Sequence, residues 1–208
     1  MYEAPIFGGP VSESGLPTTC ERFNCITKFA YATSAGYNPN NLRKVNQDSY
    51  ILLPNIMGKL GMHFFGVCDG HGSVGHHVSQ YIKQEMPHRF MQHLEMCKYF
   101  KHGKASSIIE LEQFYHQVPT YLHNTFNLIH QELINKHSWP HDATMSGSTC
   151  TAVLFDRNVV YCANAGDSRA VLYSTDKKGL RTTPLSIDHK PELLLEAARV
   201  KQMGGRID

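Results

Sequence analysis

The sequence predicts a single α+β domain, and two observations carry that prediction. Short apolar runs bounded by turn-forming residues occur before residue 70 and again after residue 146. Between them lie two long stretches in which apolar residues recur at helical spacing. Strands followed by two long helices and then by further strands are typical of a layered α+β domain. The length of 208 residues and the 41% hydrophobic content fit one such domain.

The first strands are expected to begin near residue 50. The preceding 40 or so residues are rich in Gly, Pro, Ser, Thr and Asn, which favour turns. We assign residues 1–27 to an N-terminal arm and 28–208 to the domain. Apolar runs at Tyr50–Leu53 and Met62–Cys68 are separated by the turn-forming segment PNIMGKLG, and this pattern predicts an antiparallel strand pair.

Two helices are expected over residues 75–96 and 107–137. Apolar side chains recur every four residues in the first and every three or four in the second, which places them on one side of each helix. These side chains are Val74, Val78, Ile82, Met86, Phe90 and Leu94, then Leu111, Tyr115, Val118, Leu122, Phe126, Ile129 and Leu133. Pro87 and Pro119 are expected to kink or interrupt the helices. The two stripes could dock a partner, but burial against the domain core is the favoured interpretation.

Strand signals return after the second helix. Runs rich in Val, Thr, Cys and Tyr over 149–155, 159–163 and 169–173 predict three successive antiparallel strands. Pro191 is expected to open a last helix, which Gly204 ends at its C-cap. The side chains expected on the inner side of this helix are Leu194, Leu195, Ala198 and Met203.

Composition excludes several classes of function. The formal net charge is +2 and basic residues form no long run, which argues against a dedicated nucleic-acid binder. No stretch approaches the roughly 18 consecutive apolar residues that a membrane span needs. The N-terminal residues resemble no secretory signal, and the six cysteines are spread singly without a CxxC pair. We therefore expect a monomeric cytoplasmic or nuclear protein with reduced, mostly buried thiols.

Three aspartates, Asp48, Asp69 and Asp167, stand at predicted strand ends or turns. Turn aspartates usually bond nearby backbone N–H groups. Asp69 is different because it follows a strongly apolar strand and precedes Gly70 and His71. Carboxylate and carbonyl oxygens are the ligands that Mg²⁺ and Mn²⁺ prefer. A cation held there would acidify a bound water, so hydrolysis is the expected reaction class.

Six segments of the sequence carry a resemblance to a known family. They are Arg43 with Asn46-Gln47-Asp48-Ser49, then FGVCDGHG at 65–72, SGSTCTA at 146–152, ANAGDSRA at 163–170, DHKP at 188–191 and GGRI at 204–207. In order and approximate spacing they resemble the type 2C metal-dependent protein serine/threonine phosphatases, the PPM family. The resemblance covers about residue 28 to the last residue. It implies a sandwich of two antiparallel β-sheets flanked by α-helices, with two Mg²⁺ or Mn²⁺ ions at one end.

The resemblance also implies a role for each matching metal ligand. Asp69 is similar to the carboxylate that bridges both metals, and the Gly70 carbonyl to a ligand of one of them. Asp48 would hold a metal-bound water. Asp167 matches an aspartate associated with a third, weaker metal.

Two further residues match catalytic positions of the family. Arg43 resembles the phosphate-binding arginine, whose planar fork suits a phosphate dianion. His71 resembles the general acid that protonates the leaving seryl or threonyl oxygen. A metal-bound hydroxide would then attack phosphorus in line. The alternatives are an ordinary surface arginine and a histidine that caps a turn; Thr149, Ser168 and Arg169 are assigned to the fold alone.

The sequence departs from the family pattern in two places. Gln47 stands where the family usually has an acid, so it offers a metal only a neutral oxygen. The sequence ends at Asp208, before the family's later metal-binding aspartates, so we expect an incomplete domain with an open core face and little activity of its own. Phosphorylated proteins are the expected substrates. The alternative is a non-catalytic phosphatase-like module that binds phosphoproteins or a signalling partner.

Overall fold

The computed structural model describes residues 26, 28–37, 39, 44–56, 61–96, 108–135 and 145–207. Of the predicted arm, residues 1–27, only residue 26 is described. Arg43 lies outside the described residues. The strands are β1 (Ser49–Leu53), β2 (Met62–Cys68), β3 (Gly70–His71), β4 (Gly147–Ser148), β5 (Cys150–Asp156), β6 (Val159–Ala165), β7 (Val171–Asp176) and β8 (Gly179–Pro184). The helices are α1 (Gly75–Met96), α3 (Ile108–Asn135) and α4 (Leu194–Gln202).

A four-stranded antiparallel sheet forms the centre of the fold, in the order β1-β2-β5-β6. The predicted pairing of the first two strands is confirmed, with Leu53 opposite Phe64. β2 pairs in turn with β5, where Val67 lies opposite Thr151. The predicted α+β class, with antiparallel sheets and flanking helices, is confirmed. The other ladders among the described residues, β3-β4 and β7-β8, have two strands each.

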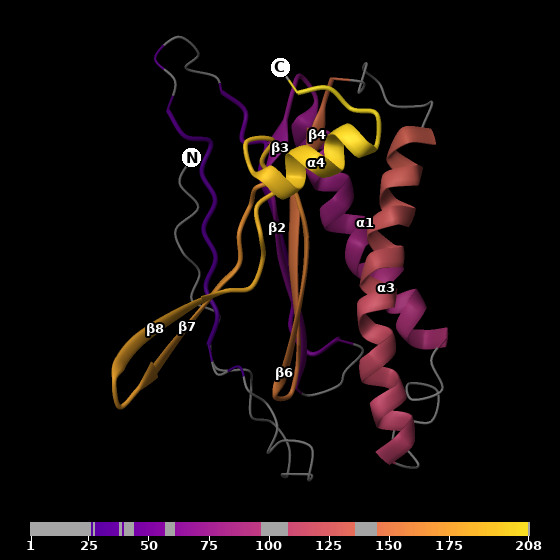
Figure 1. Ribbon diagram of the computed structural model, residues 1–208, viewed down its shortest axis with the longest axis vertical. Coiled ribbons are helices and arrows are strands. Elements are labelled where there is room, and N and C mark those ends of the chain that lie inside the picture. The colour runs from indigo at the N-terminus through magenta and orange to yellow at the C-terminus, as the bar shows by residue number, and fades with distance from the viewer. Residues whose placement is uncertain are drawn as a thin grey trace.

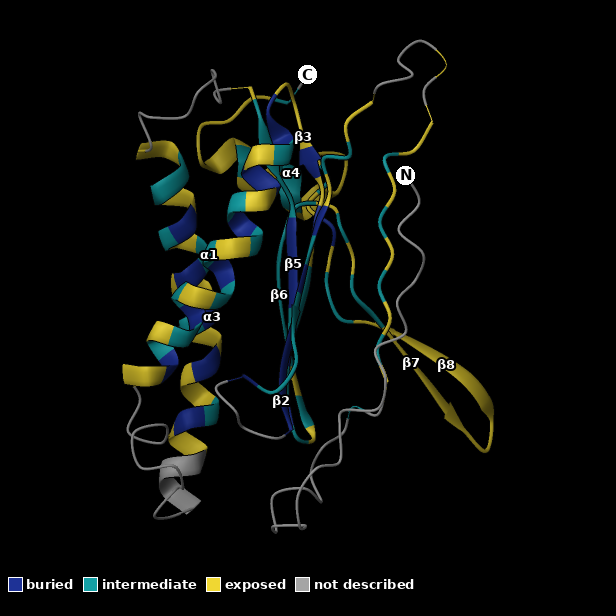
Figure 2. Cartoon of the chain, turned by 180° about the vertical axis from the view of Figure 1, so that it is seen from behind, coloured by how far each residue is buried: buried dark blue, intermediate teal, exposed yellow. Residues whose placement is uncertain are grey.

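Helices α1 and α3 cover one face of this sheet (Figure 1). The predicted stripe of α1 is buried at Val78, Ile82, Met86, Phe90 and Leu94. On α3 the buried apolar side chains are Phe114, Val118, Leu122 and Ile129. Figure 2 shows the buried residues gathered between the sheet and these helices. The interpretation that both stripes bury against the core is therefore confirmed.

The two helices are joined to each other by polar contacts. Arg89 lies 2.9 Å from a carboxylate oxygen of Glu132, and the Tyr81 hydroxyl donates to the same carboxylate at 2.9 Å. Neither Pro87 nor Pro119 ends its helix, so of the two predicted outcomes, a kink or an interruption, the interruption is wrong. Each proline removes only one backbone donor, and the packed apolar stripe holds the remaining turns in place.

In the described part of the chain, none of the helices is both long and apolar enough to cross a membrane.

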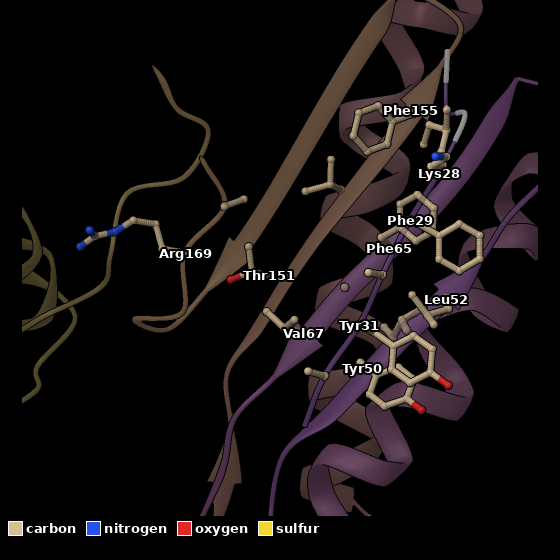
Figure 3. Close-up of a pocket in the computed structure, with 17 residues that line it drawn as sticks. Lys28, Phe29, Tyr31, Tyr50, Leu52, Phe65, Val67, Thr151, Phe155 and Arg169 are labelled. Atoms are coloured by element: carbon tan, nitrogen blue, oxygen red, sulfur yellow. The ribbon is translucent and has the colours of Figure 1, made fainter. Parts of the chain in front are cut away.

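The opposite face of the sheet borders an apolar cavity (Figure 3). Phe29 and Tyr31 belong to an extended segment that runs beside this face. The ring centroid of Phe29 lies 5.7 Å from that of Phe65, and the ring centroid of Tyr31 lies 4.4 Å from that of Tyr50. Lys83 places its ammonium 4.3 Å from the centre of the Tyr50 ring, a cation–π contact.

The third strand predicted after α3 does not extend the central sheet. β7 begins at Val171 and pairs with β8, a strand that the sequence analysis missed. The hairpin stands away from the central sheet (Figures 1 and 2), and all its residues but Val171 are exposed. The chain turns sharply after β6 at Gly166, where φ is +103°, and so it leaves the sheet before β7 begins.

The predictions for the last helix are only partly correct. α4 begins at Leu194, and Gly204, with φ +80°, follows its C-cap as predicted. The expected inner residues Leu194, Leu195 and Met203 are instead 88%, 88% and 78% exposed. Apolar spacing shows that a helix has an apolar face, but not whether another element packs on it. Among described residues, none of the helix's side chains is buried.

Candidate functional site

Four of the six predicted site residues line one cavity at the end of the sheet. Asp48 lies just before β1, Asp69 separates β2 from β3, and Gly70 and His71 form β3. The cavity measures about 580 Å³, and it is completed by Ser34, Ala35, Gly36, Lys44, Val45, Asn46, Gln47, Gly72 and Ser73. The topology therefore brings together two segments that the sequence separates by about 20 residues.

Asp69 is held by Thr149, a residue that the sequence analysis assigned to the fold alone. The Asp69 amide donates to Thr149 Oγ1 at 2.9 Å, and the Thr149 amide donates to the Asp69 carbonyl at 2.9 Å. Thr149 Oγ1 also lies 2.6 Å from Ser168 Oγ. Residues about 80 apart in sequence thus fix the backbone of Asp69. No spacing pattern in the sequence could have shown this contact.

Gly70 stands where no side chain fits. A Cβ placed there would lie 2.4 Å from the Gln47 carbonyl oxygen and 2.5 Å from that of Gly75. Both neighbours are backbone atoms, which cannot move aside as a flexible side chain would. Glycine is therefore required for the strand end that bears Asp69 to approach both the start of α1 and the segment that bears Asp48.

The Asp48 and Asp69 carboxyl groups lie close enough to interact directly. Burial raises the pKa of Asp48, and the negative charge and hydrogen bond of Asp69 raise it further, whereas Lys44 acts in the opposite direction. Two carboxylates brought together in this way attract a cation that neutralises them. Carboxylate oxygens are donors that hard divalent cations prefer in proteins, and Gly70 lines the same cavity. Within the described ranges, no group of three or more His, Cys, Asp or Glu side chains is placed to hold a metal.

His71 is exposed to the cavity, and its backbone is fixed on one side by the β3-β4 ladder. His71 pairs with Gly147, and the ring lies over that glycine so closely that a Cβ there would be 2.7 Å from Nε2. On the other side the chain turns at Gly72, where φ is +85°. Gln47 Nε2 donates to the Gly72 carbonyl at 2.8 Å.

The structure does not place Asp167 on this cavity. It is exposed and follows the Gly166 turn, while its neighbour Ser168 reaches Thr149. The roles predicted for all six residues stay predictions. Arg43 lies outside the described residues, so its predicted role rests on the sequence alone. Its neighbour Lys44 lines the cavity.

The DHKP segment supports the turn that bears Asp167. Asp188 is buried and accepts two hydrogen bonds from Arg169, at 2.8 and 2.7 Å. These hydrogen bonds lower the pKa of Asp188, with a smaller contribution from Lys190. The His189 amide donates to the Gly166 carbonyl at 2.9 Å. Arg169 therefore has the structural role that the sequence analysis assigned to it.

Comparison with known proteins identifies the family to which this chain belongs. A family model described as Protein phosphatase 2C matches residues 35–208. The chain belongs to the protein phosphatase 2C family.

Two curated relatives illustrate the degree of similarity. The chain is 31% identical over 179 residues to probable protein phosphatase 2C 35 of Arabidopsis thaliana, covering 86% of this chain and 45% of that protein. It is 30% identical over 193 residues to protein phosphatase 1L of Bos taurus, covering 93% and 49%. The chain thus spans about half the length of the curated relatives it matches.

A solved structure supports the fold. The crystal structure of serine-threonine phosphatase 2C from Toxoplasma gondii matches with a TM-score of 0.58 at 24% identity. The match covers 78% of this chain and 51% of that one. At this identity the likeness concerns the fold alone.

Proposed function

We propose that the protein hydrolyses phosphoserine and phosphothreonine in other proteins, and that the reaction depends on Mg²⁺ or Mn²⁺. The observation that carries the proposal is the pair of interacting carboxyl groups of Asp48 and Asp69, which line one cavity with Gly70. Membership of the protein phosphatase 2C family supports this reaction class. Phosphorylated proteins are accordingly the proposed substrates, and the cytoplasm or nucleus the proposed location.

Asp69, Asp48 and Gly70 are the proposed holders of the divalent cations. When bound, such cations acidify water and neutralise the charge of a phosphate group. Thr149 fixes the backbone of Asp69 at the strand end, so this carboxylate would be the most firmly placed of the proposed ligands. Asp167, which follows the turn at Gly166, is proposed to hold a third cation that is bound more weakly.

Substrate would be bound and protonated by the basic residues of the cavity. Lys44 lines it and offers a positive charge to a phosphate dianion. Arg43 is proposed to bind the phosphate through its guanidinium group. His71 is exposed to the same cavity and is proposed to give a proton to the leaving serine or threonine oxygen. A module that only binds phosphoproteins needs no paired carboxylates, so the enzyme is favoured over it.

The proposal is tested with the protein at its native length, a phosphoserine peptide and Mn²⁺. We expect phosphate release that stops when the cation is chelated. Asp69→Asn should lower kcat by at least about 100-fold, because it weakens binding of the cation that would activate the attacking water. Asp176→Asn, in the exposed β7-β8 hairpin, is the matched control and should be fully active. Release that continues unchanged under chelation would contradict the proposal.

A further inference from the structure

Gln47 occupies a position where an acidic metal ligand is expected from the family resemblance, yet its side chain is used differently. It reaches across the cavity wall to the turn that follows His71, and Nε2 donates to the Gly72 carbonyl at 2.8 Å. We propose that Gln47 is a positioning residue that holds the His71 turn, and that it is not a ligand of the metal. The inference deepens the proposed function and rests on it.

The orientation of the amide group supports this assignment. The Gly72 carbonyl can only accept a hydrogen bond, so the amide nitrogen is the atom that must face it. The amide oxygen then points to the start of α1, where it lies 2.8 Å from the position of a Cβ on Gly75. This oxygen is the only side-chain atom of Gln47 that could bind a cation. In the structure it packs against Gly75.

The backbone of Gln47 is anchored as firmly as its side chain. Its carbonyl oxygen accepts a hydrogen bond from Ser79 Oγ at 2.6 Å, and Ser79 is fully buried on α1. Ser79 Oγ also lies 3.1 Å from Ser49 Oγ at the start of β1. Residues on both sides of Asp48 are thereby joined to α1, and the Gln47 side chain extends the connection to Gly72.

His71 lies between two supports as a result. The β3-β4 ladder holds its backbone from one side, and the Gln47 hydrogen bond holds the following residue from the other. Gly72 has a φ of +85° and no side chain, so without this bond the turn has the backbone freedom of glycine. A glutamate at position 47 has no N–H to donate, and its carboxylate would face the Gly72 carbonyl oxygen. A neutral amide is therefore required for this hydrogen bond.

The choice of substrate separates a positioning role from a metal-binding role. A seryl oxygen needs a proton as it leaves, whereas p-nitrophenolate is a stable anion that leaves without one. A displaced His71 should slow hydrolysis of a phosphoserine peptide and spare p-nitrophenyl phosphate. A lost metal ligand should slow both substrates and weaken Mn²⁺ binding.

The experiment uses Gln47→Met in the protein at its native length. We expect kcat/KM for the phosphoserine peptide to fall about tenfold or more, because small displacements of a catalytic group have large effects. Hydrolysis of p-nitrophenyl phosphate and the Kd for Mn²⁺, measured by electron paramagnetic resonance, should stay within about twofold of wild type. Hydrogen–deuterium exchange of residues 69–75 should become faster. Gln84→Met, on the exposed side of α1, is the matched control and should change none of these values.

Gln47→Glu is the second variant, and it should show the same selective loss on the phosphopeptide. Full activity of this variant, or a Gln47→Met protein that binds Mn²⁺ more weakly and loses both activities equally, would overturn the inference. If the wild-type protein hydrolyses neither substrate, the proposed function fails. The role of Gln47 is then decided by exchange: faster exchange over 69–75 in Gln47→Met supports it, and unchanged exchange overturns it.

Discussion

Asp69 and Thr149 are joined by two reciprocal hydrogen bonds. The Asp69 amide donates to the threonine hydroxyl, the Thr149 amide donates to the Asp69 carbonyl, and both distances are 2.9 Å. The hydroxyl is also hydrogen-bonded to Ser168, next to Asp167. Thr149 is thus the direct connection between the strand end that bears Asp69 and the turn that bears Asp167. Any reaction that depends on both aspartates should depend on this hydroxyl.

The first prediction concerns Thr149→Val, which keeps the shape of the side chain and removes its hydroxyl. The Asp69 amide and Ser168 hydroxyl then lose their partner, and stability should fall by about 1–3 kcal/mol. We expect kcat to fall as well, because the carboxylate of Asp69 is less firmly placed. Urea denaturation and steady-state kinetics measure the two effects.

Thr149→Ser is the control because it keeps the hydroxyl. It should retain most of the activity that Thr149→Val loses. Equal losses in the two variants would show that the methyl group matters, and not the hydrogen bonds.

The second prediction concerns Gly70→Ala. The added Cβ would meet two backbone carbonyl oxygens at 2.4 and 2.5 Å, so the turn must shift. Such overpacking costs about 1–3 kcal/mol, and it should also reduce Mn²⁺ affinity because the Gly70 carbonyl moves. Thermal unfolding and metal titration measure these changes.

Gly179→Ala separates the clash from backbone strain. Gly179 has a φ of +115°, but a Cβ there meets nothing within 4 Å. It should destabilise the hairpin without changing Mn²⁺ affinity. If both variants alter metal binding alike, the tight packing around Gly70 is not the cause.

How far the sequence predicts the structure depends on the range of the interaction. The apolar stripe on α1, ending with Phe90 and Leu94, follows from helical spacing, because the same spacing decides which side faces the core. The pairing of β7 with β8 and the exposure of Leu194 depend on which elements lie nearby, and local patterns carry no such information.

The same limit applies to the candidate site. The motifs identify Asp48, Asp69 and His71, and the topology places them in one cavity. The supporting hydrogen bonds of Gln47 and Thr149 join residues 25 and 80 positions apart. Their side chains have several possible partners in the sequence, and only the folded chain selects one.

The third prediction concerns Asp48→Asn in the metal-free protein. Asp48 is destabilised by burial and by the negative charge of Asp69. Asparagine removes the charge and keeps the shape, so the metal-free protein should have a higher Tm at neutral pH. Affinity for Mn²⁺ should fall, because an anionic ligand is lost. Thermal unfolding and metal titration measure the two opposite effects.

Glu95→Gln is the control for Asp48→Asn. It removes a negative charge from an exposed position on α1 and should change neither Tm nor Mn²⁺ affinity appreciably. A lower Tm for metal-free Asp48→Asn would mean that the charge of Asp48 stabilises the fold, which contradicts the repulsion inferred from the structure.

The fourth prediction concerns the pH dependence of stability through Asp188 and Arg169. The hydrogen bonds from Arg169 hold the pKa of Asp188 below its value of about 3.9 in an unfolded chain. The folded state therefore binds a proton at Asp188 less readily than the unfolded state does. This contribution to stability is fully present above about pH 4–5 and is lost as the pH falls through the lower, folded pKa. Urea denaturation between pH 7 and pH 3 measures it.

Arg169→Gln should make this part of the acid dependence smaller, because the two charge-assisted hydrogen bonds are removed. The variant should be less stable than wild type at pH 7, and the difference should shrink as the pH falls toward 3. Lys178→Gln removes a positive charge from the exposed β7-β8 turn and should leave the pH profile of the wild type unchanged. A stability difference between wild type and Arg169→Gln that stays constant over the whole range would show that Arg169 acts by packing and not through the charge of Asp188.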